Sequence, residues 1–290
     1  MRFMSGCYGV AALCLSVLPI GPAAAAPFFF STGDPDGKMA TASRPTGAST
    51  FGIEAADDFA LAGSTTITGA SFTGLVTGTS ATVGQVQIEI FRVFPKDSDT
   101  VRTPQVPTRV NSPSDVAFAA RDAAGGGLSF STSTLAGTFT ALNSVQAGGI
   151  HPLPSVTTGG NGAVSGAEVR FDINFLTPLV LPGDHYFFVP QVEVSGGDFL
   201  WLSAPKPIVA PGTPFPPGTT DLQSWTRDDA LDPDWLRVGT DIVGGEPPPT
   251  FNASFSLTGT SDATPVPEPA TLALFLGAVA GLAVRRRPAA

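Results

Sequence analysis

The sequence predicts an all-β protein, an antiparallel β-sandwich of jelly-roll-like form with long loops. Gly and Pro number 33 and 28 among 290 residues, and both interrupt helices and favour turns. Several short stretches alternate apolar and polar side chains, as half-buried strands do. Between the two ends, no stretch shows the 3.6-residue period of an amphipathic helix. Strands with one apolar face bury it by packing two sheets together.

The first predicted element is a signal peptide at residues 1–26. Arg2 supplies its positive charge, residues 10–20 its apolar run, and Ala24–Ala26 its small-residue cleavage site. The run is too short to span a membrane. The alternative, an apolar N-terminus of the folded domain, does not explain the order of the three parts. Export machinery and signal peptidase are therefore expected partners.

The body is predicted as one domain, residues 27–262, although a division near residues 95–125 stays open. Its first 20 residues are expected to form an irregular arm. The clearest strands are 85–90, 168–175 and 251–257, and weaker candidates are 67–76, 128–130, 139–142, 185–194 and 199–203. Long loops at 95–115, 147–166 and 205–250 separate them, and such loops are often functional or disordered. The 21 phenylalanines are expected to fill the core.

Charge and cysteine content exclude several classes of function. Residues 27–269 hold 11 basic and 24 acidic residues, a net charge of −13, which disfavours nucleic acid as a partner. An acidic body suits a secreted protein or one that collects cations. Both cysteines, Cys7 and Cys14, lie in the leader, so its removal leaves no disulfide, thiolate nucleophile or cysteine metal ligand.

No catalytic residue is predicted, and the protein is expected not to be an enzyme. The sequence contains no G-x-S-x-G elbow and no H-E-x-x-H motif. His151 and His185 are interpreted as ordinary turn or surface residues. Asp184 precedes His185, but neighbouring strand residues point to opposite faces, so the two are poorly placed to form a dyad. Paired carboxylates of the glycosidase kind stay open, because the sequence does not show which of them converge.

Two groups of residues are candidates for binding. Two pairs of aspartates, each two residues apart in a turn-rich segment, are candidate calcium ligands: Asp34 with Asp36, and Asp232 with Asp234. The favoured alternative is that they are solvated turn residues. Trp225 and Trp235 lie beside Asp228 and Asp229, an arrangement that an exposed sugar-binding face uses. Buried indoles are the commoner case.

The last predicted element is the tail, residues 263–290. Residues 270–284 are fifteen apolar or neutral residues, about 22 Å as a helix at about 1.5 Å per residue. A bilayer core is about 30 Å thick, so this helix is short for a permanent anchor. Arg285, Arg286 and Arg287 follow it and would stay cytoplasmic, leaving the body outside.

This tail resembles the PEP-CTERM sorting signal of exported bacterial proteins. The matching residues are Val266, Pro267, Glu268 and Pro269, the apolar segment 270–284, and Arg285–Arg287. The resemblance implies recognition by an exosortase, a membrane transpeptidase, with cleavage near the Pro-Glu-Pro motif. It also implies transient anchoring in the inner membrane and delivery to the cell envelope or extracellular matrix. The body, with "EAADDFAL" at residues 54–61, is similar to uncharacterised proteins of this kind.

These observations predict an exported envelope or matrix protein with a structural or adhesive role. The alternatives are a carbohydrate-binding module of the exopolysaccharide layer, with calcium as a candidate cofactor, and a polysaccharide-active hydrolase.

Overall fold

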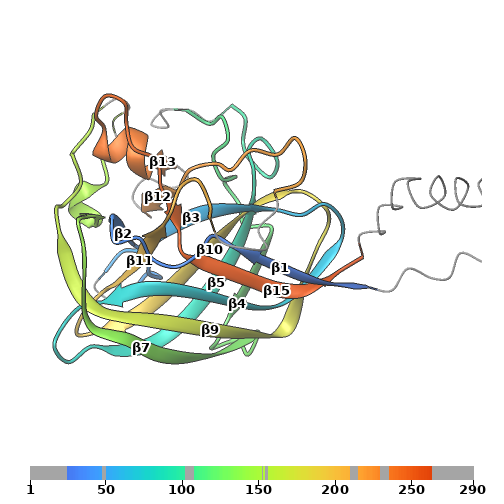
Figure 1. The fold of residues 1–290 in the computed structure, drawn as a ribbon, viewed down its shortest axis with the longest axis horizontal. Coiled ribbons are helices and arrows are strands. Elements are labelled where there is room, and N and C mark those ends of the chain that lie inside the picture. Colours follow the sequence, from blue (N-terminus) through green and yellow to red (C-terminus); the bar gives the residue numbers. More distant parts are fainter. Residues whose placement is uncertain are drawn as a thin grey trace, which may run out of the picture. The chain divides into compact units, whose positions relative to one another are not determined.

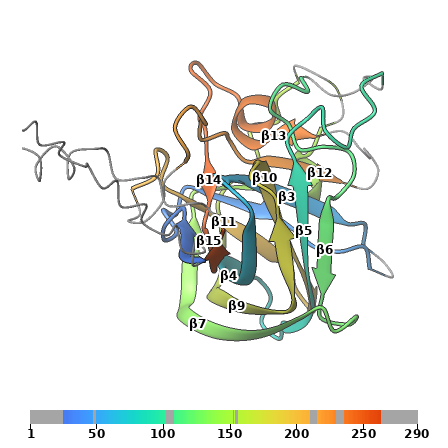
Figure 2. The ribbon, with the colours of Figure 1, turned by 90° about the vertical axis from the view of Figure 1, so that its right-hand side faces the viewer.

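The computed structural model consists of fifteen strands in two β-sheets (Figure 1, Figure 2). It describes residues 25–47, 50–101, 108–151, 153, 156–209, 215–228 and 235–262. The all-β prediction is confirmed, whereas the jelly-roll-like sandwich topology remains a prediction. Within these ranges the helical segments are a 3₁₀ turn, η1 (Ala147–Gly149), and a π-helical turn, η2 (Val238–Val243). None of the described helices has the length and hydrophobicity needed to cross a membrane.

The larger sheet has nine strands. Its main path is β1 (Ala26–Ser31), β15 (Phe255–Ser261), β4 (Thr65–Val76), β11 (Phe199–Ala204), β2 (Met39–Ala42) and β8 (Asn143–Val145). Beside this path, β9 (Val164–Leu181) pairs with β4 and β7 (Leu128–Ala141), and β14 (Asn252–Ala253) pairs with β11. The pairs are antiparallel except β2 with β8, which is parallel and departs from the antiparallel prediction.

The smaller sheet has six strands, all in antiparallel pairs. Their order is β13 (Leu236–Arg237), β12 (Trp225–Asp228), β3 (Ile53–Ala60), β10 (His185–Ser195), β5 (Thr82–Arg92) and β6 (Ala119–Asp122). The register places Tyr186 of β10 between Phe59 of β3 and Arg92 of β5.

Both sheets contribute to the main hydrophobic core, and phenylalanine dominates it as predicted. Phe188 of the smaller sheet stacks on Phe255 of the larger one with 5.1 Å between ring centroids. Within the larger sheet, Phe72 and Phe171 stack at 4.9 Å. A second apolar cluster, which includes Phe187 and both Trp225 and Trp235, packs separately from this core. Aromatic contacts of this kind add to the area that the core buries.

The long connections and the longest strands occupy different parts of the body. In both ribbon views, the segments 108–118 and 237–250 lie at the upper end, whereas β7 and β9 run along the lower margin (Figure 1, Figure 2). The predicted strands near 85–90, 168–175, 185–194, 199–203 and 251–257 are present. Residues 128–130 and 139–142 were predicted as two short strands. The structure instead has one strand, β7, which runs from residue 128 to residue 141.

Four of the strands that lie where the sequence predicted none are β1, β2, β3 and β12. The expected N-terminal arm contains β1 and β2, because Phe28–Phe30 find their partner in β15, far along the chain. β3 lacks an alternating pattern because nearly all of its side chains are buried. β12 lies inside the predicted 205–250 loop, where it pairs with β3. In each case the partner is distant in sequence, so the local pattern carries no trace of it.

Candidate functional site

Two adjacent carboxylates on β3, Asp57 and Asp58, form the centre of the candidate site. Successive strand residues point to opposite faces of a sheet, so each carboxylate meets a different set of neighbours. Both side chains belong to residues that are only 1% exposed. Buried carboxylates require hydrogen-bond donors, and the site is defined by the groups that supply them.

Asp58 is held by His185 and by the segment that precedes β12. Its Oδ2 lies 2.6 Å from His185 Nε2, and both carboxylate oxygens lie 3.1 Å from the backbone N–H of Leu222. The interpretation of His185 as an ordinary turn or surface residue is therefore wrong. Its carboxylate partner is on a neighbouring strand of the sheet, whereas the adjacent Asp184 binds Lys96 Nζ at 2.5 and 2.7 Å.

Asp57 joins β3 to the last part of the body. Its Oδ2 accepts a hydrogen bond of 2.8 Å from the backbone N–H of Ala253. Its Oδ1 lies 3.1 Å from Ser224 Oγ, which also lies 3.0 Å from the carbonyl oxygen of Phe251. The carboxylate thus links segments that are 167 and 196 residues away in sequence.

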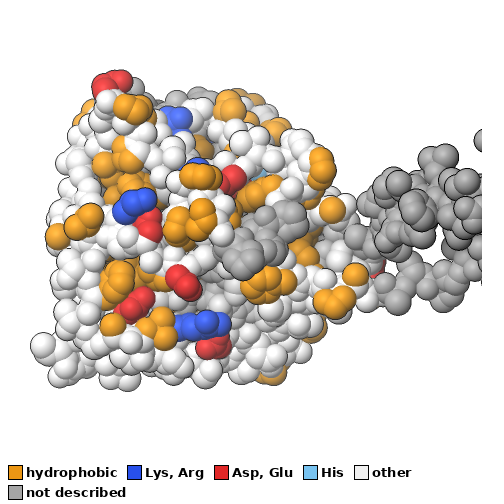
Figure 3. Space-filling model, in the orientation of Figure 1, with side chains coloured by type: hydrophobic (Ala, Val, Ile, Leu, Met, Phe, Trp, Pro, Cys, Tyr) orange, Lys and Arg blue, Asp and Glu red, His pale blue; other side chains and the backbone are white. Residues whose placement is uncertain are grey.

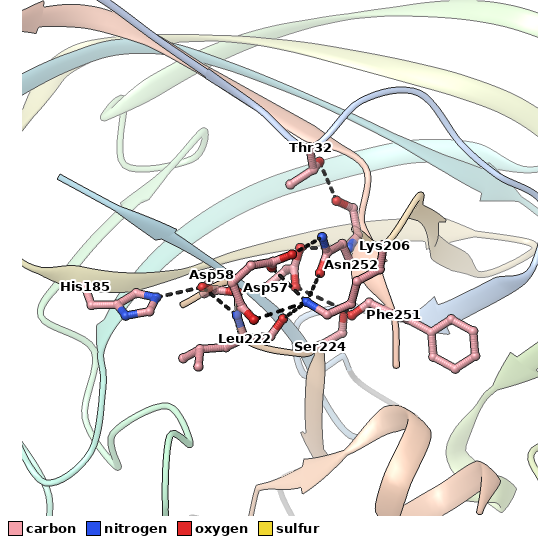
Figure 4. A network of polar contacts seen from close by, with 11 residues as sticks. Thr32, Asp57, Asp58, His185, Lys206, Leu222, Ser224, Phe251 and Asn252 are labelled. Carbon is pink, nitrogen blue, oxygen red and sulfur yellow. Dashed lines mark hydrogen bonds and ion pairs between the residues drawn. The ribbon is translucent and has the colours of Figure 1, made fainter. Parts of the chain in front are cut away.

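Lys206 completes the cluster of polar groups (Figure 4). Its Nζ lies 2.8 Å from Asp221 Oδ1 and 2.8 Å from Asn252 Oδ1, and it donates to the carbonyl oxygen of Leu222. Asn252 Nδ2 in turn donates to Asp221 Oδ2 at 3.1 Å. We call the following residues the β3 network: Asp57, Asp58, His185, Lys206, Asp221, Leu222, Ser224, Asn252 and Ala253.

The surroundings of Asp57 and Asp58 favour the protonated forms of their carboxyl groups. Burial raises the pKa of Asp57 well above its usual range, and the adjacent Asp58 adds to this, while the Ala253 N–H and Lys206 act against it. Burial also raises the pKa of Asp58, against the hydrogen bond and charge of His185. Two carboxylates this close resist carrying two charges together.

Two grooves lie beside the β3 network. The first has a volume of about 510 Å³ and the second about 350 Å³, and Asn111, Thr220 and Leu222 line both, so the two adjoin. The polar residues of the first are Asn111, Asp184, His185, Thr219 and Thr220. The amide, hydroxyl and imidazole groups of this groove can form hydrogen bonds with a polar ligand.

The predicted sugar-binding residues do not form an exposed face. Trp225 and Trp235 are each 1% exposed, so neither ring presents a surface on which a sugar could stack. Trp235 Nε1 donates to the carbonyl oxygen of Ser114 at 3.0 Å, and Arg227 lies over its ring, 4.4 Å from the centroid. Asp228 is also buried, and Asp229 lies outside the described residues. The indoles are buried because they pack in the second apolar cluster.

The predicted calcium ligands fall in two places. Asp36 accepts a hydrogen bond from Ser203 Oγ at 2.5 Å and pairs with Lys38 Nζ at 3.1 Å, so its carboxylate is engaged by protein groups. Asp232 and Asp234 lie outside the described residues. In the described part of the chain, no three His, Cys, Asp or Glu side chains come together as a metal site would require.

A second carboxylate cluster, also unpredicted, lies on the smaller sheet. Glu54 of β3 pairs with Arg227 of β12 and interacts with Glu89 of β5. Burial and then the Glu54 carboxyl raise the pKa of Glu89 to about 7. Neither glutamate lines the two grooves beside the β3 network. The sequence shows alternation around Glu89, which predicts a solvated side chain, and only the pairing of β3, β10 and β5 brings the groups together.

The C-terminal sorting residues, from Val266 to Arg287, lie outside the described residues, so their geometry is not part of the site. No curated protein and no solved structure matches the chain significantly. One family does match: the PEP-CTERM protein-sorting motif, over residues 265–287. This match covers the motif predicted from Val266–Pro269, the apolar segment and the arginine cluster. The chain is therefore an exported protein that carries a PEP-CTERM sorting signal, which directs it to exosortase processing toward the cell envelope.

Proposed function

We propose that residues 27–262 act as a structural or adhesive component of the cell envelope or extracellular matrix, without enzymatic activity. The sorting motif supports delivery to that location. The single observation that supports the role is the β3 network, whose polar groups bind one another. Through hydrogen bonds, Asp57 and Asp58 join β3 to Leu222, Ser224 and Ala253. Lys206 joins the segments around residues 222 and 252 to each other. Such cross-links suit a body that must hold its shape outside the cell.

Processing at both ends belongs to the same proposal. Signal peptidase removes residues 1–26, residues 270–284 lie transiently in the inner membrane, and the exosortase cleaves near Pro267–Pro269. Mass spectrometry of the native C-terminus, combined with cell fractionation, tests this. A terminus near residue 268 in the extracellular or outer envelope fraction supports the proposal. An intact Arg285–Ala290 end in the inner membrane indicates a plain anchor instead, and mature protein confined to the cytoplasm contradicts export.

The structural role has its own test, which uses a strain without the gene. We expect loss of matrix cohesion or surface attachment, restored by the wild-type chain. The control is a chain with Pro267, Glu268 and Pro269 changed to Ala, which we expect to fold normally but to fail to restore the phenotype. Normal cohesion in the strain without the gene would contradict the structural role while leaving the export result intact.

A second candidate function is binding of a neutral exopolysaccharide in the paired grooves. The observation that favours it is the polar lining of the first groove, where His185, Asn111 and Thr220 offer hydrogen bonds. Titration of the processed protein with host exopolysaccharide, with and without added calcium, tests this. Asn111→Ala and Thr220→Val should weaken binding at least fivefold, whereas Ser80→Ala, in a distant turn, should not. Equal binding by all variants places the sugar elsewhere, and hydrolysis of the polysaccharide would indicate the hydrolase alternative.

A further inference from the structure

The strand β7 has an unpaired side. It runs from Leu128 to Ala141 and pairs with β9 along one edge. Its other edge pairs with no described strand, and none of the backbone hydrogen bonds from described loops reaches it. In both ribbon views it lies at the lower margin of the body (Figure 1, Figure 2). A strand edge of this length offers a row of free N–H and C=O groups to another strand.

The side chains of β7 are exposed on both faces of the sheet. Residues 131–135 are exposed without interruption, and Phe130, Ala136 and Phe139 are the half-buried positions between the two ends. The sequence "LSFSTSTLAGTFTA" contains no charged residue and no proline. The lower margin of the face in Figure 3 is accordingly mostly white, with few charged side chains. Neither side-chain bulk nor charge blocks the approach of a second strand.

The other edge strands of the described body are protected in the ways that natural sheets use. β8, β13 and β14 have three residues or fewer. β6 has four residues and carries Arg121 and Asp122, and β1 contains Pro27. Short edges, charges and proline all discourage pairing between sheets. β7 is the exception, with fourteen residues and none of these features.

We propose that β7 is a strand-pairing surface for a second copy of this chain. The segment Ser129–Thr134 keeps a continuous register with β9, and register shifts begin only beyond Thr134, so this half presents a regular edge. Antiparallel pairing of the segment with itself gives a closed two-fold dimer in which both copies use the same residues. The interaction is independent of the proposed matrix role.

A second copy fits this edge because an uncharged strand of regular register can pair with an identical strand without bringing like charges together. Residues 27–269 carry a net charge of −13, so two copies repel each other over most of their surfaces. An uncharged edge is where this repulsion is weakest. The neighbouring charges on β9 are balanced in part, because Arg170 Nε lies 2.8 Å from Asp172 Oδ1. A strongly basic partner would gain nothing from the hydroxyl-rich edge itself.

Sedimentation of the exported, processed protein tests the proposal. We expect a dimer, and we expect Thr132→Lys to weaken dimerisation at least tenfold while its circular dichroism spectrum stays that of the folded wild type. Ser80→Lys, at an exposed turn, is the matched control and should leave the dimer intact. A wild-type protein that sediments as a monomer overturns the proposal. A dimer that Thr132→Lys leaves unchanged overturns it as well.

Cysteine cross-linking gives a second readout that does not depend on a destabilised edge. The body contains no cysteine, so single substitutions Ser129→Cys, Ser131→Cys and Ser133→Cys introduce one thiol each. Under mild oxidation at least one of them should form a covalent dimer, because a two-fold axis brings equivalent residues close together. Ser80→Cys should not. Cross-linking that is no faster in the β7 variants than in Ser80→Cys contradicts the pairing.

Discussion

The strands β3 and β7 are both rich in polar residues, yet their surroundings are opposite. β3 buries seven of its eight residues, including Asp57 and Asp58, whereas β7 exposes most of its fourteen. In β3 each polar group meets a specific donor from a distant segment. In β7 the hydroxyl side chains face water and one backbone edge is free. Polar residues in a strand therefore indicate neither burial nor exposure by themselves.

The largest effect is expected from Asp57→Ala. It removes the acceptor of the buried Ala253 N–H and leaves a cavity, so the unfolding free energy should fall by about 3–4 kcal/mol. Asp57→Asn is the control, since its amide oxygen can still accept that hydrogen bond and the buried charge is gone. It should stay within about 1 kcal/mol of wild type. Urea denaturation measures both, and equal losses would show that charge matters more than the hydrogen bond.

Gly74→Ala probes the packed interior without changing a polar group. A Cβ at Gly74 of β4 would lie 2.6 Å from Phe199 Cζ and 2.7 Å from the carbonyl oxygen of Leu200. Neither can move easily inside a packed sheet, so we expect a loss of about 2–3 kcal/mol. Thermal and urea unfolding measure it. A neutral result would show that β4 and β11 can separate at this point.

Glu89→Gln tests the second buried carboxylate cluster through pH. The pKa of Glu89 is raised from 4.5 to about 7, so between these values the folded state holds a proton that the unfolded state has released. The unfolding free energy should therefore fall as pH rises through this window, by at most about 3 kcal/mol. Glu89→Gln should remove this part of the slope. Identical pH profiles for the two proteins between pH 5 and 8 would contradict the burial of Glu89.

The smallest effect is expected in β7. A Cβ at Gly137 would meet nothing within 4 Å, and its φ is not in the left-handed region. Gly137→Ala should therefore change the unfolding free energy by less than about 0.5 kcal/mol, in the stabilising direction, because alanine restricts the unfolded chain. Differential scanning calorimetry beside Gly74→Ala makes the comparison between interior and edge direct. A marked loss would mean that β7 is covered by another part of the chain.

The sequence predicted those parts of the fold in which one strand face is polar and the other apolar. The alternation of Val86, Ile88 and Ile90 identified β5, and similar patterns identified β9 and β15. β10 corresponds to one of the weaker candidates, residues 185–194. β3 was not predicted because its polar residues are buried on both faces of the sheet, so its sequence shows no alternation. The 33 Gly and 28 Pro residues, together with these alternating stretches, predicted the all-β class.

The candidate site was less accessible to prediction, since its members come from separate segments. His185 and Asp58 are 127 residues apart, and Asp57 and Ala253 are 196 apart. No local pattern reports such pairings. The Trp residues show the same limit. Their position beside Asp228 and Asp229 left a sugar-binding face open as an alternative to burial, and the sequence does not show which segments pack over them. The sorting motif succeeded because its information is entirely local, within residues 265–287.

The pairing of β1 with β15 has a consequence for the order in which the body forms. β1 holds Phe28, Phe29 and Phe30 and, among the described strands, pairs only with β15, whose residues 256–261 come last in the body. During export the N-terminal strand must therefore wait, with its aromatic side chains uncovered, until almost the whole domain has emerged. Contacts over such separations close slowly. The burial of these side chains therefore depends on the last strand of the body.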